Sequence, residues 1–157
     1  DLGAINSREQ LTKIQELAAV GDSEGAERWS PQCNLSDKGF WFAPTIFTGV
    51  TQAHRIAQEE IFGPVLVIIP FDDEAEAIKI ANDTPYGLAA YLQTGDLERA
   101  QRIATRLRAG AIHINGGGLN YGSPFGGYKQ SGNSRDKHMM SLLSYTQSKS
   151  AWFSMGA

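Results

Sequence analysis

The sequence of 157 residues predicts an α/β fold in which parallel strands are joined by crossover helices. Residues 65–69 form a continuous apolar run, which is typical of a strand that is covered on both faces. Further strands are expected at residues 87–94 and 111–115, and a segment with helical periodicity precedes each of them. Because crossovers of this kind are right-handed and return the chain in the same direction, the strands should form one parallel sheet.

The first helix is predicted to start after Ser7, because Ser7 and Gln10 have the spacing of a capping box. One apolar stripe follows at helical spacing, formed by Leu11, Ile14, Leu17 and Ala18. Gly21 is expected to end this helix just after Val20. The polar residues 21–39 are then expected to form a loop with one weak strand.

Residues 40–50 predict a strand, because aromatic and β-branched side chains are frequent in them. Pro44 should disturb a central position of a ladder in this strand. Residues 52–58 suit a short helix, which the turn residues Gly63 and Pro64 would separate from the apolar run that follows.

Two aspartates mark the starts of the crossover helices. Asp73, with Glu76 three residues later, can cap a helix whose apolar stripe includes Ile78. Asp96 caps the next helix, and Gly110 is expected to end it. The apolar face of that helix consists of Leu97, Ala100, Ile103, Ala104 and Leu107.

The C-terminal part of the chain has a different character. Residues 116–132 form a long loop rich in glycine, and long loops in compact domains are usually functional. One more helix is expected at residues 135–143. Residues 145–155 carry Trp152 and Phe153 but have no partner strand nearby in the sequence, so we expect another subunit or segment to cover them.

Composition limits the class of protein. The chain is 41% hydrophobic and 20% charged, as soluble globular domains are, and it is long enough to bury a core. A net charge of −3 argues against nucleic acid or an anionic membrane as a partner. No apolar run approaches the roughly 20 residues of a transmembrane helix, and a single cysteine cannot form an internal disulfide. We therefore expect a cytoplasmic protein.

Residue types and spacing alone offer few candidates for catalysis. Glu59 and Glu60 are neighbours, so in an extended segment their side chains point in opposite directions and cannot form an acid and base pair. On composition, both belong to a solvated helix end. Cys33 lies in a polar loop without a nearby base, so we interpret it as a surface thiol and not a nucleophile. No metal site is expected from the spacing of the three histidines, and the glycines of residues 116–127 do not match a phosphate-binding loop.

Two motifs give this chain a more specific interpretation. Residues 58–65 read Gln-Glu-Glu-Ile-Phe-Gly-Pro-Val, and residues 124–132 read Pro-Phe-Gly-Gly-Tyr-Lys-Gln-Ser-Gly. Together they resemble two motifs in the C-terminal region of the NAD(P)-dependent aldehyde dehydrogenases. Residues 42–47 and 82–88 are also similar to recurrent segments of that family, so the resemblance extends over nearly the whole chain.

The resemblance implies roles for three residues. In the family, the second glutamate of the first motif accepts hydrogen bonds from both hydroxyls of the nicotinamide ribose, and this role falls on Glu60. A carboxylate suits the task because its two oxygens can face two vicinal hydroxyls at once. Phe62 would pack near the nicotinamide end of NAD or NADP, with a core aromatic as the alternative. Phe125 would contact the organic part of the aldehyde substrate, at an entrance lined by the glycine-rich loop.

Asp136 is a candidate auxiliary carboxylate. The family usually continues after the second motif with glycine, arginine and glutamate, and that glutamate is proposed to move protons during thioester hydrolysis. This chain has Ser134-Arg135-Asp136, which keeps the carboxylate but shortens its reach by one methylene. A surface ion pair of Asp136 with Arg135 or Lys137 is the alternative.

The resemblance also implies an activity. In the family, a cysteine attacks the aldehyde carbonyl, hydride passes to NAD(P)+, and water hydrolyses the thioester to release a carboxylic acid. Cys33 does not correspond to that nucleophile, so no residue of this chain is predicted to be catalytic, and Asp136 remains the candidate auxiliary carboxylate. We expect the chain alone to be inactive and to bind the cofactor weakly or not at all.

Domain organisation and partners follow from the same resemblance. Residues 1–143 would be the C-terminal portion of the catalytic domain, and residues 144–157 an oligomerisation tail strand through which a homo-oligomer forms. The tail is most similar to the branch that oxidises γ-glutamylaminobutyraldehyde or aminobutyraldehyde, so an amino- or γ-glutamylamino-aldehyde is the expected substrate. The alternative function is a non-catalytic interaction or oligomerisation module derived from an aldehyde dehydrogenase.

Overall fold

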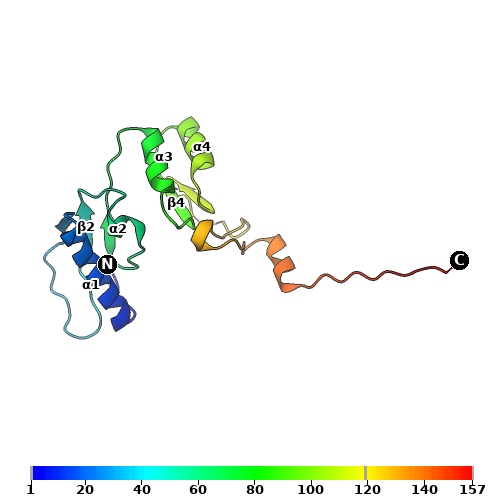
Figure 1. Cartoon of the computed structure of the whole chain (residues 1–157), viewed down its shortest axis with the longest axis horizontal. Coiled ribbons are helices and arrows are strands. Elements are labelled where there is room, and N and C mark those ends of the chain that lie inside the picture. The colour runs from blue at the N-terminus through cyan, green and yellow to red at the C-terminus, as the bar shows by residue number, and fades with distance from the viewer. Residues whose placement is uncertain (1, 119, 157) are drawn as a thin grey trace. The chain divides into compact units, whose positions relative to one another are not determined.

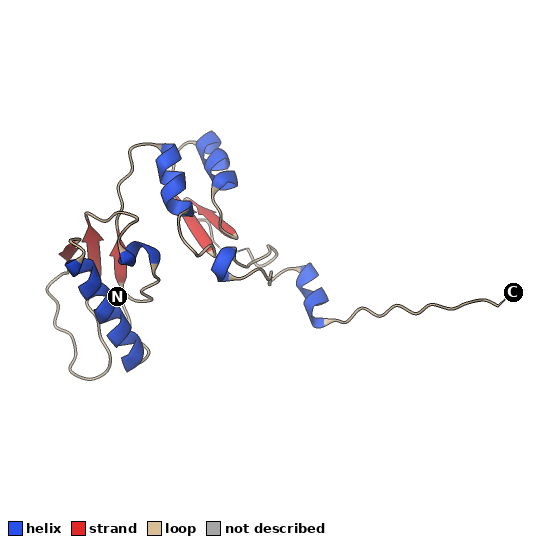
Figure 2. Cartoon of the chain, viewed as in Figure 1, coloured by secondary structure: helices blue, strands red, loops and turns tan. Residues whose placement is uncertain are grey.

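Helices and strands alternate along the chain in a computed structural model, which describes residues 2–118 and 120–156 (Figure 2). The chain divides into two units, Asp1–Asp83 and Thr84–Ala157. Each unit contains helices and one pair of parallel strands. The predicted α/β class is therefore confirmed.

Unit 1 contains three helices and a three-stranded sheet (Figure 1). Its elements are α1 (Arg8–Ser23), β1 (Glu27–Trp29), β2 (Thr45–Thr48), α2 (Arg55–Gln58), β3 (Val65–Val67) and α3 (Glu74–Asn82). The strand order is β1-β2-β3, in which β1 runs antiparallel to β2 and β3 runs parallel to it. The weak strand expected between residues 21 and 39 is thus β1.

Unit 2 contains a two-stranded parallel sheet and its crossover helix (Figure 1). Its elements are β4 (Ala89–Leu92), α4 (Leu97–Arg106), β5 (Ala111–Ile114) and the 3-10 helices η1 (Lys129–Ser131) and η2 (Met139–Tyr145). The order β4, α4, β5 is the strand, helix and strand succession that the sequence predicts.

The core of unit 1 lies between α1, α2 and one face of the sheet. Phe47 and Ile14 are completely buried there, and Ile56 of α2 packs in the same cluster. The register pairs Trp29 with Ile46 and Ile46 with Leu66, so these three side chains form a row on the opposite face. That second face is the more exposed one.

The predicted helix starts are confirmed in all three cases. Ser7 accepts a hydrogen bond from the backbone N–H of Gln10 at 3.1 Å. Asp73 and Asp96 accept corresponding bonds from the third residue after each of them, at 2.8 and 3.0 Å. These short polar side chains satisfy backbone donors that the first helical turn leaves without partners.

The predicted end of the first helix at Gly21 is wrong. Helix α1 continues to Ser23, and Gly21 is buried within it. A Cβ at this position would lie 2.8 Å from Ile56 Cδ1 and 3.1 Å from the Phe47 ring, so glycine is required for packing and not for termination. Gly25, with a φ of +91°, provides the left-handed residue after the helix.

The predicted parallel pairing is present in both units. Strand β3 pairs parallel with β2 in unit 1, and β4 pairs parallel with β5 in unit 2, while a single sheet that contains β3, β4 and β5 stays a prediction. The periodicity of a sequence gives the order of strands and helices, but it does not identify the neighbour of each strand. Pro44 lies just before β2, where its missing N–H costs the ladder nothing.

The helix expected at residues 135–143 is not an α-helix. Asp136 pairs with Phe125 in an antiparallel bridge, and only the 3-10 helix η2 follows, capped by the His138 ring nitrogen. Residues 146–156 form neither helix nor strand (Figure 1). The expected pairing of this tail with another segment therefore stays a prediction, as does the boundary between residues 143 and 144. No helix among residues 2–118 and 120–156 is long and apolar enough to cross a membrane.

Candidate functional site

The first motif forms a loop that connects α2 to β3 in unit 1. Helix α2 ends at Gln58, and the backbone is extended at Glu59, with φ −100° and ψ 136°. Ile61 is buried in the core of the unit, so it anchors the loop from within. A Cβ at Gly63 would lie 2.5 Å from Ile14 Cδ1, because the loop passes directly against α1 at this point. Pro64 then accepts a hydrogen bond from the N–H of Thr45, and this bond leads into the pairing of β2 with β3.

The side chain of Gln10 holds this loop against α1. Its Nε2 donates to the carbonyl oxygens of Ile61, at 2.9 Å, and of Phe62, at 3.1 Å. In a capping box this side chain would bond back to Ser7, so only the serine half of the predicted box is formed. The Gln10 side chain, which would form the other half of the box, instead contacts a segment about fifty residues away in the sequence.

The two neighbouring glutamates have different environments. Glu59 forms an ion pair with Arg55, through Nε and through Nη2, one helical turn away. This hydrogen bonding by Arg55 is the main cause that lowers the pKa of the Glu59 carboxyl below its usual value. Glu60 is exposed, and none of the residues that the structure describes forms a hydrogen bond or ion pair with its carboxylate. Glu60 therefore presents two free acceptor oxygens, which can accept hydrogen bonds from the two hydroxyls of a vicinal diol.

Phe62 is not a core aromatic. Its ring is 68% exposed, and its backbone has a φ of +57°, a conformation that costs an ordinary side chain roughly 1–2 kcal/mol. Two contacts hold Phe62 in this strained backbone conformation. Ile61 is buried next to it, and Gln10 donates hydrogen bonds to the carbonyl oxygens of Ile61 and Phe62. The loop thus presents Glu60 and an aromatic ring to the outside, on a backbone that is fixed from the core side.

The second motif encloses the start of β4 in unit 2. Tyr128 N–H donates to the Gly87 carbonyl at 2.9 Å, and Gly87 N–H donates to Ser131 Oγ at 3.0 Å. Lys129 Nζ donates to the carbonyl oxygen of Thr84 at 2.9 Å. Residues 84–88, the part of the segment 82–88 that lies in unit 2, therefore meet residues 124–132, although the sequence treats the two as separate motifs.

Two glycines make the close packing of this motif possible. A Cβ at Gly110 would collide with the carbonyl oxygen of Gly126, and a Cβ at Gly126 would collide with the carbonyl oxygen of Ser134. Three backbone segments thus pass one another without side chains between them. This contact fixes the position of the residue before Gly126, which is Phe125.

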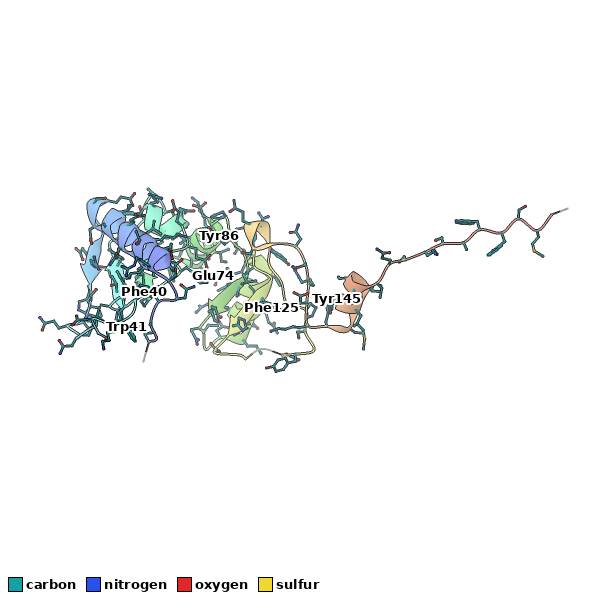
Figure 3. The ribbon with its side chains drawn as sticks, turned by 90° about the horizontal axis from the view of Figure 1, so that it is seen from below. Phe40, Trp41, Glu74, Tyr86, Phe125 and Tyr145 are labelled. Atoms are coloured by element: carbon teal, nitrogen blue, oxygen red, sulfur yellow. The ribbon has the colours of Figure 1, made fainter. Side chains whose placement is uncertain are left out.

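Phe125 is half-buried and is held by a two-bond antiparallel bridge (Figure 3). Its N–H donates to the Asp136 carbonyl at 3.0 Å, and the Asp136 N–H donates back to the Phe125 carbonyl at 2.8 Å. The ammonium of Lys137 lies 4.9 Å from the centroid of the Phe125 ring. The aromatic ring expected to contact a substrate therefore has a cation directly beside it.

Asp136 is brought to Phe125 through its backbone, and its side chain is exposed. The ion pair considered for it does not form: among the residues with described coordinates, neither Arg135 nor Lys137 approaches the Asp136 carboxylate within 4.0 Å. Arg135 instead donates to the carbonyl of Gly127 at 2.8 Å and lies over the Tyr128 ring.

The remaining candidate side chains have structural contacts. Cys33 is an exposed free thiol, as predicted. His54 accepts a hydrogen bond from the Thr51 N–H, and His113 stacks on Tyr91 with ring centroids 4.8 Å apart. No group of three potential metal-ligating side chains occurs within the described ranges.

Two residues near the candidate positions are not identified by sequence reasoning. The sequence predicts Gln10 as part of a helix cap and Lys137 only as a partner in a surface ion pair. Their contacts with the Phe62 loop and the Phe125 ring depend on tertiary structure, for which spacing in the sequence gives no signal.

Similarity to known proteins extends over both sequence and fold. The model of the aldehyde dehydrogenase family matches residues 1–151. The chain is 48% identical to a 3-succinoylsemialdehyde-pyridine dehydrogenase of a Pseudomonas species, over 87% of this chain and 29% of that protein. It is 42% identical to a betaine aldehyde dehydrogenase of Mesorhizobium japonicum, over 99% of this chain and 33% of that protein.

Solved structures of aldehyde dehydrogenases are similar to this chain in fold as well as in sequence. An aldehyde dehydrogenase from Mycobacterium tuberculosis, complexed with NAD+, matches with a TM-score of 0.91 and 42% identity, over 100% of this chain and 33% of the other. The indole-3-acetaldehyde dehydrogenase AldA of P. syringae, in complex with NAD+, matches with a TM-score of 0.89 and 44% identity, over 98% and 32% of the two chains. The chain thus spans about a third of the length of the relatives that it matches.

Proposed function

Because the chain belongs to the aldehyde dehydrogenase family, we propose that it forms the C-terminal part of an enzyme that oxidises an aldehyde to a carboxylic acid with NAD+ or NADP+. The observation that carries this proposal is the contrast between Glu59 and Glu60. Glu59 is neutralised by Arg55, whereas Glu60 has no partner among the described residues and lies on a rigid loop. A free carboxylate on a fixed backbone is suited to bind two hydroxyl groups of a ligand.

Each candidate residue has a role in this proposal. Glu60 accepts hydrogen bonds from the nicotinamide ribose hydroxyls, and the exposed ring of Phe62 packs near the nicotinamide end. Phe125 contacts the organic part of the aldehyde, and Asp136 is an auxiliary carboxylate held next to it by the backbone bridge. The cofactor, when bound, accepts hydride from the substrate.

Several parts of the reaction are not assigned to this chain. Cys33 is exposed in unit 1, and among the described residues no side chain forms a hydrogen bond or ion pair that would activate its thiolate, so we propose that the residues of this chain alone do not complete the reaction. Cofactor binding by the chain alone would be weak, because one carboxylate and one ring supply few of the contacts that a dinucleotide needs.

The substrate and the assembly are proposed from the sequence motifs. An amino- or γ-glutamylamino-aldehyde is the proposed substrate, which corresponds to the γ-glutamylaminobutyraldehyde or aminobutyraldehyde branch. Residues 144–157 are proposed as an oligomerisation tail that follows the catalytic portion of residues 1–143, and the protein as a homo-oligomer. We also propose a cytoplasmic location, which rests on the composition of the chain.

A second candidate function is a non-catalytic interaction or oligomerisation module. The observation in its favour is the tail, in which Trp152, Phe153 and Met155 are almost fully exposed. Against it stands the fixed Glu60 loop, since assembly through the tail does not require a free carboxylate in unit 1.

The proposal is tested with Glu60→Gln and the matched control Glu59→Gln, both made in the protein as its host produces it. Glu60→Gln should weaken NAD+ binding about ten- to a hundredfold, because hydrogen bonds to a charged acceptor are replaced by weaker ones. Glu59→Gln, which removes only a surface ion pair, should change the NAD+ dissociation constant less than about threefold. Isothermal titration calorimetry measures both.

Equal effects of the two substitutions would contradict the role of Glu60. If the unmodified protein binds neither NAD+ nor NADP+ and yet self-associates, the interaction module becomes the better description.

A further inference from the structure

The side chain of Lys137 places a cation beside the ring of Phe125. The ammonium of Lys137 is 4.9 Å from the centroid of the Phe125 ring and 5.9 Å from that of Tyr121. The side chain is exposed, and no acidic group forms an ion pair with it within the described coordinates. Attraction between the ammonium and the electron-rich faces of the two rings fixes the cation without neutralising its charge.

The backbone fixes this arrangement. Lys137 directly follows the bridge between Phe125 and Asp136, which the two hydrogen bonds of 2.8 and 3.0 Å hold together. Its φ of +64° is a left-handed conformation that lysine adopts only when the surrounding structure imposes it. The backbone bends at Lys137, directly after the bridge, and the side chain lies over the ring of Phe125. The position of the cation is therefore a property of the fold and not of a free surface lysine.

We propose that Lys137 is a specificity-determining residue, which selects aldehydes that carry a carboxylate at the end remote from the carbonyl and disfavours aldehydes that carry a cation there. This inference rests on the proposed function, because it requires Phe125 to contact the organic part of the substrate. An ammonium held on aromatic faces keeps N–H donors for a third partner, and a carboxylate is the acceptor with which it forms the strongest hydrogen bonds. A cationic group at the same place would meet a like charge.

The inference separates the two proposed substrate classes. A γ-glutamylamino-aldehyde carries both an α-carboxylate and an α-ammonium at its far end, so that end has no net charge and its carboxylate offers a partner for Lys137. A simple amino-aldehyde carries only a cation and offers none. The carboxylate-bearing class is therefore the better match to this chain.

Three aldehydes with a main chain of four carbons test the inference: succinic semialdehyde is anionic, butanal is neutral, and 4-(trimethylammonio)butanal is cationic. NADH formation by the protein as its host produces it gives kcat/KM for each. Lys137→Met should lower the ratio of succinic semialdehyde to butanal about tenfold, mainly through KM, and raise the ratio of the cationic aldehyde to butanal. The loss of one charged hydrogen bond and its Coulomb attraction accounts for this magnitude.

Two further variants complete the design. Lys137→Arg keeps a cation that can lie on aromatic rings, so it should preserve the preference for the anionic aldehyde within about threefold. Lys38→Met removes an exposed lysine in unit 1 and should leave all three ratios unchanged. High ionic strength should reduce the preference of the unmodified protein for the anion, because salt screens exposed charges.

The outcomes distinguish this inference from the proposed function. NADH formation with unchanged ratios in Lys137→Met would overturn the role of Lys137 alone. No NADH formation with any of the three aldehydes would overturn the proposed function, and the inference with it. A shift of the ratios in Lys38→Met equal to that in Lys137→Met would show that net charge, and not the position beside Phe125, determines the preference.

Discussion

One amide side chain, that of Gln10, connects the first turn of α1 to the loop of the first motif. The two carbonyls that it binds belong to Ile61 and Phe62, the residues that directly follow Glu60. Phe62 has a positive φ, so this loop has a conformation that local sequence preference opposes. The direction of Glu60 therefore depends on a contact made from another part of the chain.

Substitution of Gln10 by Ala should destabilise the loop and weaken NAD+ binding together. Two hydrogen bonds to loop carbonyls are lost, so we expect the free energy of unfolding to fall by about 1–2 kcal/mol. The NAD+ dissociation constant should rise severalfold, because Glu60 is then less well positioned. Urea denaturation and calorimetric titration give the two values. Gln15→Ala, at an exposed position of the same helix, is the control, and similar losses in both variants would refute the positioning role.

The sequence predicts the beginning of α1 well and the role of Gln10 incorrectly, for one physical reason. Capping by Ser7 is local, since donor and acceptor are three residues apart. The partners of the Gln10 side chain are 51 and 52 residues away, and no spacing rule places them. The ion pair of Arg55 with Glu59 is local like the cap, because the two residues are four apart, and it leaves the carboxylate of Glu60 unpaired among the described residues.

Among the elements, the contact of β5 with the second motif depends most strictly on glycine. Gly110 immediately precedes β5, and its Cα faces the carbonyl oxygen of Gly126 without room for a Cβ. Gly110 also donates its N–H to Gly87, just before β4. The start of both strands and the second motif are thus joined at one point.

Gly110→Ala should destabilise unit 2 by about 1–3 kcal/mol, because the added methyl group forces the backbone segments apart. Hydrogen exchange should become faster at the amides of Ala111 and Tyr128, which bond to carbonyls at the start of β4. Gly95→Ala is the control, since a Cβ there meets nothing within 4 Å. If exchange at these amides is equally fast in both variants, the glycine contact is not what holds the motif.

The helices and strands differ in how far the sequence predicts them. The starts of α1, α3 and α4 follow from side chains that cap their own helix. The end of α1 does not, because Gly21 is selected by its contact with Ile56 and not by the chain reversal that glycine usually marks. The partner of β3 is a tertiary property for the same reason.

At the scale of the whole chain, the tail carries large apolar side chains that are exposed to solvent. Trp152, Phe153 and Met155 are each about nine-tenths exposed, at 93%, 87% and 92%. Residues 146–156 make no strand, although their composition suits one. Side chains of this size gain free energy when they are buried, so the tail favours association.

Removal of residues 144–157 should therefore lower the self-association of the protein. Sedimentation velocity should show a smaller species, or a dissociation constant at least tenfold higher, for the shortened protein. The double substitution of Trp152 and Phe153 by Ser should have a similar effect without a change in length. Unchanged sedimentation in both variants would exclude the tail as the oligomerisation segment.

The glycine contact between Gly110 and Gly126 also has an evolutionary consequence. Because both ends of residues 111–125 are fixed there, the loop that follows β5, which is exposed at residues 115–118 and 120–124, can gain or lose residues without moving the scaffold. Doubling the length of such a loop adds only about 0.6 kcal/mol of closure entropy. Insertions and deletions in that loop therefore cost little folding free energy, so related proteins can differ in the surface around Phe125 and retain the same fold.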